Sequence, residues 1–327
     1  MKAESKVADF PVSPSSVERQ HQESRTCKVV ETSATSARVY WFSCLLPEAS
    51  HFKVDELPVI KQERGILRLL VIAGNLSHFG GDITVILLEH WKKQWDHILF
   101  VPGPYEYGKG TVCLGDDYCA MLQQQMGHEK FTVFLPGLTD SVLFRGPNVR
   151  VLGAPCWPVG DCTVYKEARV YEPVSNIETL SGSSLEKARM GIVNDCLYLG
   201  KQTAEKRLKR DVATLVVALR EVEAVRAEET RIVVTYGCPD EQLSTEIKHN
   251  NPFRGTVALG SPAFYTYFGR HVDWWIHGAA GDSVRASMCA SRVTTLCNLY
   301  TAIHHRHGDG FRERIEKAIH IKKKDSN

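Results

Sequence analysis

The residues of this sequence that are best suited to chemistry stand singly, each in a loop that follows an apolar run. They offer a thiol, an amide, imidazoles and carboxylates, which are groups that bind metal ions or transfer protons. These candidates are Cys44, Asn75, His78, Glu106, His277 and Asp282. One thiolate among scattered neutral groups falls short of the three or four ligands of a zinc site. A metal-dependent reaction would therefore need a replacement site assembled from these loops.

Two of the candidates also have a simpler structural interpretation. Glu106 is expected to accept backbone hydrogen bonds within its loop, and His277 is expected to be packed or hydrogen-bonded. Farther along the chain, three histidines gather at positions 304, 305 and 307 without an acidic or thiol partner at ligand spacing. We expect that cluster to be a solvated polar loop.

Five loops that directly follow apolar runs contain most of the candidates. Steps of about 30 residues separate the first three loops, and about 40 residues separate the last two. The loops read Ser43-Cys44-Leu45-Leu46, Ala73-Gly74-Asn75-Leu76, Pro102-Gly103-Pro104-Tyr105-Glu106, Thr235-Tyr236-Gly237-Cys238-Pro239 and Trp275-Ile276-His277-Gly278-Ala279-Ala280-Gly281.

In order and spacing, these loops resemble the signature of the calcineurin-like metallophosphoesterases, over about residues 38 to 300. In that family the motifs read Asp-x-His, Gly-Asp, Gly-Asn-His-Glu, a His after an apolar strand, and Gly-His-x-His. Their side chains hold two divalent cations that activate a water molecule to attack phosphorus. The resemblance implies a four-layer α/β/β/α sandwich, in which two mixed sheets are flanked by helices.

The sequence departs from the family at the positions that bind metal. Leucine and alanine offer no ligand atom, and the neutral amide of Asn75 replaces a carboxylate that bridges both cations. The degenerate positions are Cys44, Leu46, Asn75, Pro104, Tyr105, Tyr236, Ala279 and Gly281. The motif residues that are retained are Gly74, Gly103, Glu106, His277, Gly278 and Asn298. Most of the retained residues shape backbone turns and packing.

These departures imply a catalytically inactive relative of the family, which needs no cofactor and is not an enzyme. We expect a structural or adaptor subunit of a larger assembly, with a protein partner that the sequence does not identify. Two alternatives stay open: a phosphoesterase or other hydrolase with a rebuilt metal site, and a protein that binds a phosphorylated ligand without hydrolysing it. Elemental analysis and phosphoesterase assays distinguish them.

The elements that must position these loops are buried strands alternating with helices. Strands are predicted at 39–42, 67–73, 98–101, 131–135, 149–153, 231–235 and 272–276 because each run is apolar and ends at Gly, Pro or small polar residues. Helices are predicted over 82–95 and 203–227 from three- and four-residue apolar spacing. We expect a flexible arm over 1–37, one domain over 38–300 and a polar, basic tail over 301–327.

Composition narrows the class of protein. The chain has 327 residues, 43% of them hydrophobic, and a net charge of +2, so nucleic-acid binding is indicated only weakly, by the basic tail. No apolar segment has the length of a signal peptide or membrane span. The ten cysteines form no CxxC pair and suit buried, reduced thiols. We expect a cytoplasmic protein, with import into an organelle left open.

Overall fold

A computed structural model describes the central part of the chain and several short segments beyond it. The described residues are 27–43, 45, 62–77, 82–107, 112–156, 201–223, 229–237, 239, 272–278, 285–287, 294–297 and 318–322. Statements about structure below refer to these residues.

Two mixed β-sheets form the centre of the molecule. The five-stranded sheet has the order β12 (Ile319–Lys322), β2 (Ser36–Phe42), β3 (Ile66–Ala73), β4 (His97–Val101) and β5 (Phe131–Val133). The seven-stranded sheet has the order β1 (Cys27–Val30), β6 (Ser141–Phe144), β7 (Val149–Ala154), β8 (Thr230–Thr235), β9 (Trp274–His277), β11 (Thr294–Cys297) and β10 (Arg285–Ser287). Strands β2 to β5 are parallel, as are β7, β8, β9 and β11, so the loops after each set meet at one edge.

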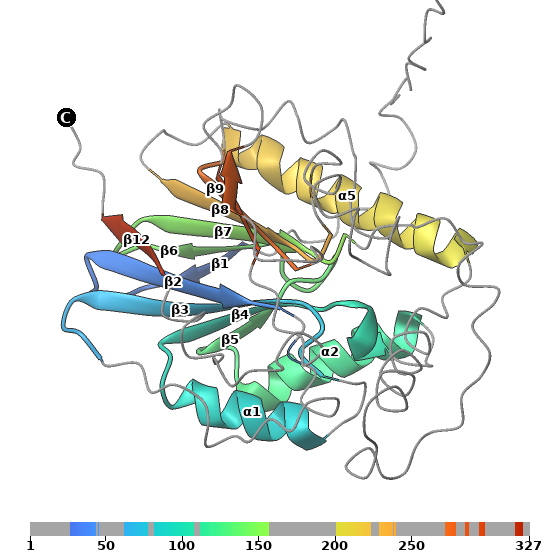
Figure 1. Cartoon of the computed structure of the whole chain (residues 1–327), viewed down its shortest axis with the longest axis horizontal. Coiled ribbons are helices and arrows are strands. Elements are labelled where there is room, and N and C mark those ends of the chain that lie inside the picture. The colour runs from blue at the N-terminus through green and yellow to red at the C-terminus, as the bar shows by residue number, and fades with distance from the viewer. Residues whose placement is uncertain are drawn as a thin grey trace, which may run out of the picture.

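Helices cover the outer faces of both sheets. α1 (Asp82–Lys92) and α2 (Val112–Met126) lie on the five-stranded sheet, and α5 (Lys201–Glu223) lies on the seven-stranded sheet, as Figure 1 shows. A short 3-10 helix, η3 (Pro104–Tyr107), follows β4. The expected four-layer α/β/β/α sandwich is therefore confirmed.

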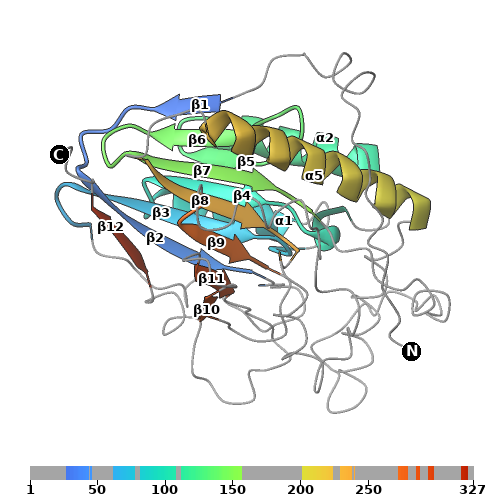
Figure 2. The same cartoon turned by 90° about the horizontal axis from the view of Figure 1, so that it is seen from above.

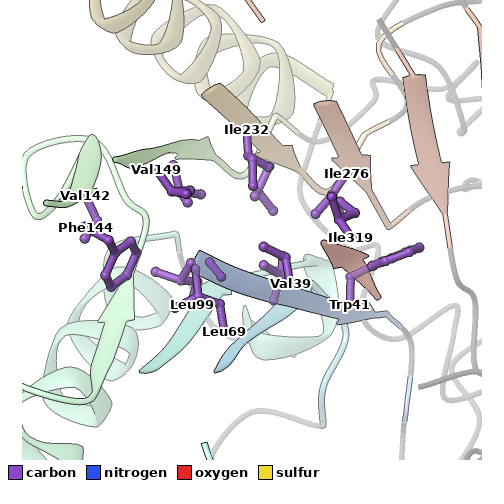
Figure 3. Close-up of a cluster of buried hydrophobic side chains, with 14 of the residues drawn as sticks. Val39, Trp41, Leu69, Leu99, Val142, Phe144, Val149, Ile232, Ile276 and Ile319 are labelled. Atoms are coloured by element: carbon purple, nitrogen blue, oxygen red, sulfur yellow. The ribbon is translucent and has the colours of Figure 1, made fainter. Parts of the chain in front are cut away.

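The inner faces of the two sheets share one apolar core, which Figure 3 shows in close-up. Val39, Leu69 and Leu99 of the five-stranded sheet pack toward Val149 and Ile232 of the other sheet. Strands with neighbours on both sides and layers on both faces are buried throughout, which explains the unbroken apolar runs of β3 and β4.

Both outermost described segments are strands of the sheets. β1 pairs in parallel with β6, and β12 pairs antiparallel with β2, at edges that Figure 2 shows from above. β1 lies within the expected arm at 1–37, and β12 lies within the expected tail at 301–327. The sheets therefore extend beyond the expected domain limits of 38 and 300.

No helix in the described part of the chain combines the length and the apolar character that crossing a bilayer requires.

Candidate functional site

The loops after β3, β4, β8 and β9 come together where these strands end. The glycines show how closely their backbones approach. A Cβ atom at Gly74 would lie 2.4 Å from Cδ2 of Tyr236 and 3.0 Å from Cα of Gly103. A Cβ atom at Gly278 would lie 1.7 Å from the carbonyl oxygen of Ala73. Loops from both sheets are thus in contact, and these glycines are required because a side chain would not fit.

Glu106 fastens the loop after β3 to the loop after β4. Its carboxylate is 1% exposed and accepts hydrogen bonds from four backbone N–H groups. The donors are Gly103 at 2.6 Å, Asn75 at 3.0 Å, Ser77 at 3.3 Å and Leu76. Burial raises the pKa of this carboxyl, whereas the four N–H groups lower it and favour the ionised carboxylate that accepts all four hydrogen bonds. Glu106 thus has the structural part expected for it, and both its oxygens are engaged by backbone.

Asn75 and Tyr236 join the two sheets across the site. The Asn75 amide nitrogen donates to the Tyr236 hydroxyl oxygen at 2.9 Å. Asn75 has a φ of 54°, in the left-handed region that Asn tolerates better than most side chains, and the preceding Gly74 has a φ of 84°. Asn75 is buried, whereas Tyr236 is partly exposed. Of these two residues, Tyr236 is the one whose side chain reaches the surface.

Ser43 and His277 complete the described part of the site. Ser43, the last described residue before Cys44, donates from its hydroxyl to the Gly278 carbonyl oxygen at 3.0 Å. This bond brings the end of β2 to the end of β9.

His277 is buried, and burial lowers its pKa to about 3, so its ring is neutral at physiological pH. It is a core histidine on β9 rather than a titrating group.

Several predicted site residues lie outside the described part of the chain. Cys44, Leu46, Ala279, Gly281 and Asn298 belong to this group, as do His78, Asp282 and the histidines at 304, 305 and 307. The backbone of Pro104 and Tyr105 forms part of η3, and their side chains are not described. The structure therefore brings together Gly74, Asn75, Gly103, Glu106, Tyr236, His277 and Gly278.

The described residues do not fit the two-metal centre that the fold family implies. Within this part of the chain, no three residues of the types His, Cys, Asp and Glu form a group that could hold an ion. Asn75 turns its amide nitrogen toward Tyr236, and Glu106 is engaged by N–H groups. No step through a metal ion is derived for these residues.

Two sets of polar residues were missed by the sequence reasoning. Ser43 has a plain signal, since it is the polar residue directly after an apolar strand. Arg207 and Asp211 are buried on α5, a helix that was predicted over 203–227 from its apolar spacing alone. Counting back from Leu219 and Leu215 in steps of four leads to 211 and then 207, and that signal could have identified both.

Comparisons with known proteins place the fold. No family model and no curated protein sequence matches this chain. Among solved structures, it is similar to a phosphopantetheinyl hydrolase from Mycobacterium tuberculosis, with a TM-score of 0.53 and 12% identity over 85% of this chain and 94% of the other. A putative 5′-nucleotidase from Staphylococcus aureus matches with a TM-score of 0.40 and 12% identity over 80% of this chain and 48% of the other, a similarity too low to support an argument.

The chain therefore has a metallophosphoesterase-type fold. The expectation that it is not an enzyme is corrected by this comparison, because the protein whose fold it shares is a hydrolase. The sequence reasoning took the loss of the family's ligands as the loss of catalysis and kept a hydrolase with a rebuilt site only as an alternative. At 12% identity the likeness establishes the fold and leaves the reaction to the residues of this chain.

Proposed function

We propose that this chain is a hydrolase of phosphate esters whose site is rebuilt at the ends of β3, β4, β8 and β9. The observation that supports the proposal most directly is the Asn75–Tyr236 hydrogen bond, which joins the two sheets where their loops meet. In an α/β sheet, the carboxyl ends of parallel strands are the usual place for a ligand. The carboxylate of Glu106 holds the backbone on which that bond depends.

In this proposal Tyr236 contacts the substrate. Its oxygen accepts the hydrogen bond from Asn75, so the hydroxyl proton points away from Asn75. A hydroxyl in that position donates to a phosphoryl oxygen, and a hydrogen bond to a charged group contributes about 1.5–3 kcal/mol.

The test combines metal analysis with turnover. The purified chain is assayed on phosphomonoesters and phosphodiesters with added manganese, and its bound metal is measured by elemental analysis. We expect Tyr236→Phe to lower kcat/KM about 10- to 100-fold, the equivalent of the lost charged hydrogen bond. The matched control is Tyr118→Phe on α2, a partly buried tyrosine that packs against the apolar cluster under α1 and α2. Absence of turnover on both substrate classes, with no binding of either, would reject the proposal.

A second candidate function is docking to a protein partner. Large apolar side chains are exposed on the two helices of the five-stranded sheet, at Ile86 on α1 and Met121 on α2, each 52% exposed. A protein contact at this face requires that the two side chains belong to one continuous apolar patch. Affinity purification from the native cell tests this, with the double variant Ile86→Lys, Met121→Lys as the comparison. Recovery of the unaltered chain as a free monomer only would count against a partner.

A further inference from the structure

A buried charged cluster lies beside the site, between α5, α2 and η3. The side chains of Arg207 and Asp211 are 1% and 0% exposed. The Arg207 guanidinium donates to three partners: to Asp116 Oδ1 at 2.8 Å, to the Tyr107 hydroxyl at 2.7 Å and to Asp211 Oδ2 at 3.3 Å. Only a planar guanidinium with several fixed donors can serve these three acceptors at once.

Tyr107 is the point at which this cluster reaches the site. It directly follows Glu106 in η3, and it is held on all sides. Its hydroxyl donates to Asp116 at 2.6 Å, and the Arg207 guanidinium carbon lies 4.8 Å from its ring centroid. Gly115 of α2 provides the space for the ring, since a Cβ atom there would lie 1.8 Å from it. In a four-residue turn, fixing Tyr107 also fixes the direction of the Glu106 side chain.

The other end of the cluster holds the seven-stranded sheet. Asp211 accepts a hydrogen bond at 3.1 Å from the backbone nitrogen of Cys156, which follows β7. Cys156 has a φ of 46°, a conformation that most side chains avoid. Arg210 contributes a further bond to Asp116 at 3.1 Å. The cluster thus connects the end of β7 in one sheet to the turn after β4 in the other.

The energetics of such a cluster favour a role in geometry over one in stability. Removing two or more charges from water costs several kcal/mol per ion, and an apolar replacement of similar volume is often as stable. An apolar replacement would not fix the direction of the Tyr107 hydroxyl or the backbone nitrogen of Cys156. What the charges add here is a unique position for η3.

We propose that Arg207 is a positioning residue: it fixes Tyr107 and thereby holds the Glu106 carboxylate under the amides of Gly103 and residues 75–77. In this arrangement Asn75 reaches Tyr236, so the cluster sets the geometry at the ligand end of the sheets. The inference rests on the proposed function only in treating that end as the site of action.

The experiment uses the whole chain and two variants. Tyr107→Phe removes only the hydroxyl that bonds Arg207 and Asp116. Arg207→Lys keeps the positive charge and loses the several fixed donors of the guanidinium group. The matched control is Arg150→Lys, which alters a similarly buried ion pair to Glu229, with N···O distances of 2.7 and 2.9 Å, between β7 and β8. Tyr107→Phe keeps the test valid if Arg207→Lys does not fold.

The readout is local. Amide hydrogen exchange and amide proton chemical shifts are measured at residues 75, 76, 77 and 103. We expect about tenfold faster exchange at these four amides in both variants, the effect of about one weakened hydrogen bond, and shifts that move away from the carboxylate-bonded values. Arg150→Lys should leave the four amides unchanged.

Two results would overturn the inference. One is unchanged exchange and unchanged shifts at the four amides in folded Tyr107→Phe. The other is exchange that becomes faster in β6 and β7 by as much as at the four amides. The cluster would then stabilise the fold as a whole without positioning η3. The outcome is independent of turnover. Changed amides in a chain that neither binds nor cleaves phosphate esters would keep the positioning role and reject the proposed function.

Discussion

At the scale of single residues, the backbone geometry of the site depends on Glu106 and Gly103. Glu106 accepts four N–H groups, and Gly103 has space for hydrogen alone. Both residues belong to the family's pattern, and both have parts to play that need no metal ion. Their retention in this sequence is explained by the backbone of the site, whichever reaction takes place there.

Glu106→Gln should therefore destabilise the fold markedly. In glutamine, an NH₂ group replaces the carboxylate oxygen that accepts the N–H groups of Leu76 and Ser77. These two buried donors then lose their acceptor. We expect a loss of about 2–4 kcal/mol in the free energy of unfolding, measured in urea. Glu31→Gln, which alters an exposed ion pair with Arg145, should cost less than about 0.5 kcal/mol. Equal effects of the two would contradict this account of Glu106.

Gly103→Ala tests the close approach of the loops. The added Cβ atom would lie 2.3 Å from Asn75 Oδ1 and 2.7 Å from the Asn75 backbone nitrogen, so the loop must move. We expect a loss of about 2–3 kcal/mol, as for an overpacked core. Gly127→Ala is the control: its φ of 81° carries strain of about 1 kcal/mol, with nothing within 4 Å. A smaller loss at 103 than at 127 would refute the packing argument.

At the scale of elements, the sequence predicted the strands that are covered on both faces. The apolar strands at 67–73 and 98–101 agree with β3 and β4 within a residue, because strands covered on both faces need apolar side chains throughout. α2 was missed because its buried face includes Gly115 and Gln123. Gly115 is there to receive Tyr107, a tertiary requirement that no helical periodicity reveals.

The candidate site was predictable to a similar degree. Gly74, Gly103 and Gly278 were singled out as residues that shape backbone turns, and in the structure each lies where a Cβ atom would meet a neighbouring loop. The Asn75–Tyr236 bond and the Arg207 cluster were not predictable, because each joins residues of distant segments through side-chain directions. The burial of Arg207 reflects its three acceptors: Asp116 and Tyr107 lie on other elements, and Asp211 lies one turn further along the same helix.

β12 gives a prediction at this scale. Its residues alternate between buried and exposed, with Ile319 and Ile321 in the core between the sheets and His320 and Lys322 outside. Ile319→Ala should cost about 2–4 kcal/mol of unfolding free energy, by thermal or urea denaturation. Lys322→Ala should change it by less than about 0.5 kcal/mol. If the two variants are equally stable, β12 does not contribute to the core.

At the scale of the whole molecule, two buried histidines make stability depend on pH. Burial lowers the pKa of His97 and of His277 to about 3, with Lys28 adding to the effect at His97. The unfolded chain binds protons at these residues below about pH 6.5, and the folded chain does not. Their contribution to stability is therefore complete above pH 6.5 and is lost as pH falls toward 3.

Each of these histidines should remove about 1.4 kcal/mol of stability per pH unit within that window. Urea unfolding of the unaltered chain and of His277→Gln between pH 7 and pH 4 measures the contribution of His277 to this loss. The unfolding free energy of the variant should fall less steeply as pH falls, by about 1.4 kcal/mol per pH unit. His320→Gln, at an exposed residue of β12, is the control. Parallel curves for the unaltered chain and His277→Gln would contradict a neutral, buried ring.

The pairing of β12 with β2 has a consequence for how the protein is made. β2 is among the first described strands to leave the ribosome, and β12 is the last. Until residues 319–322 have been synthesised, the outer edge of β2 lacks the strand that covers it, and open strand edges recruit other chains. A nascent chain of this protein is thus open to edge-to-edge association at β2 from the synthesis of residues 36–42 until β12 pairs with that strand.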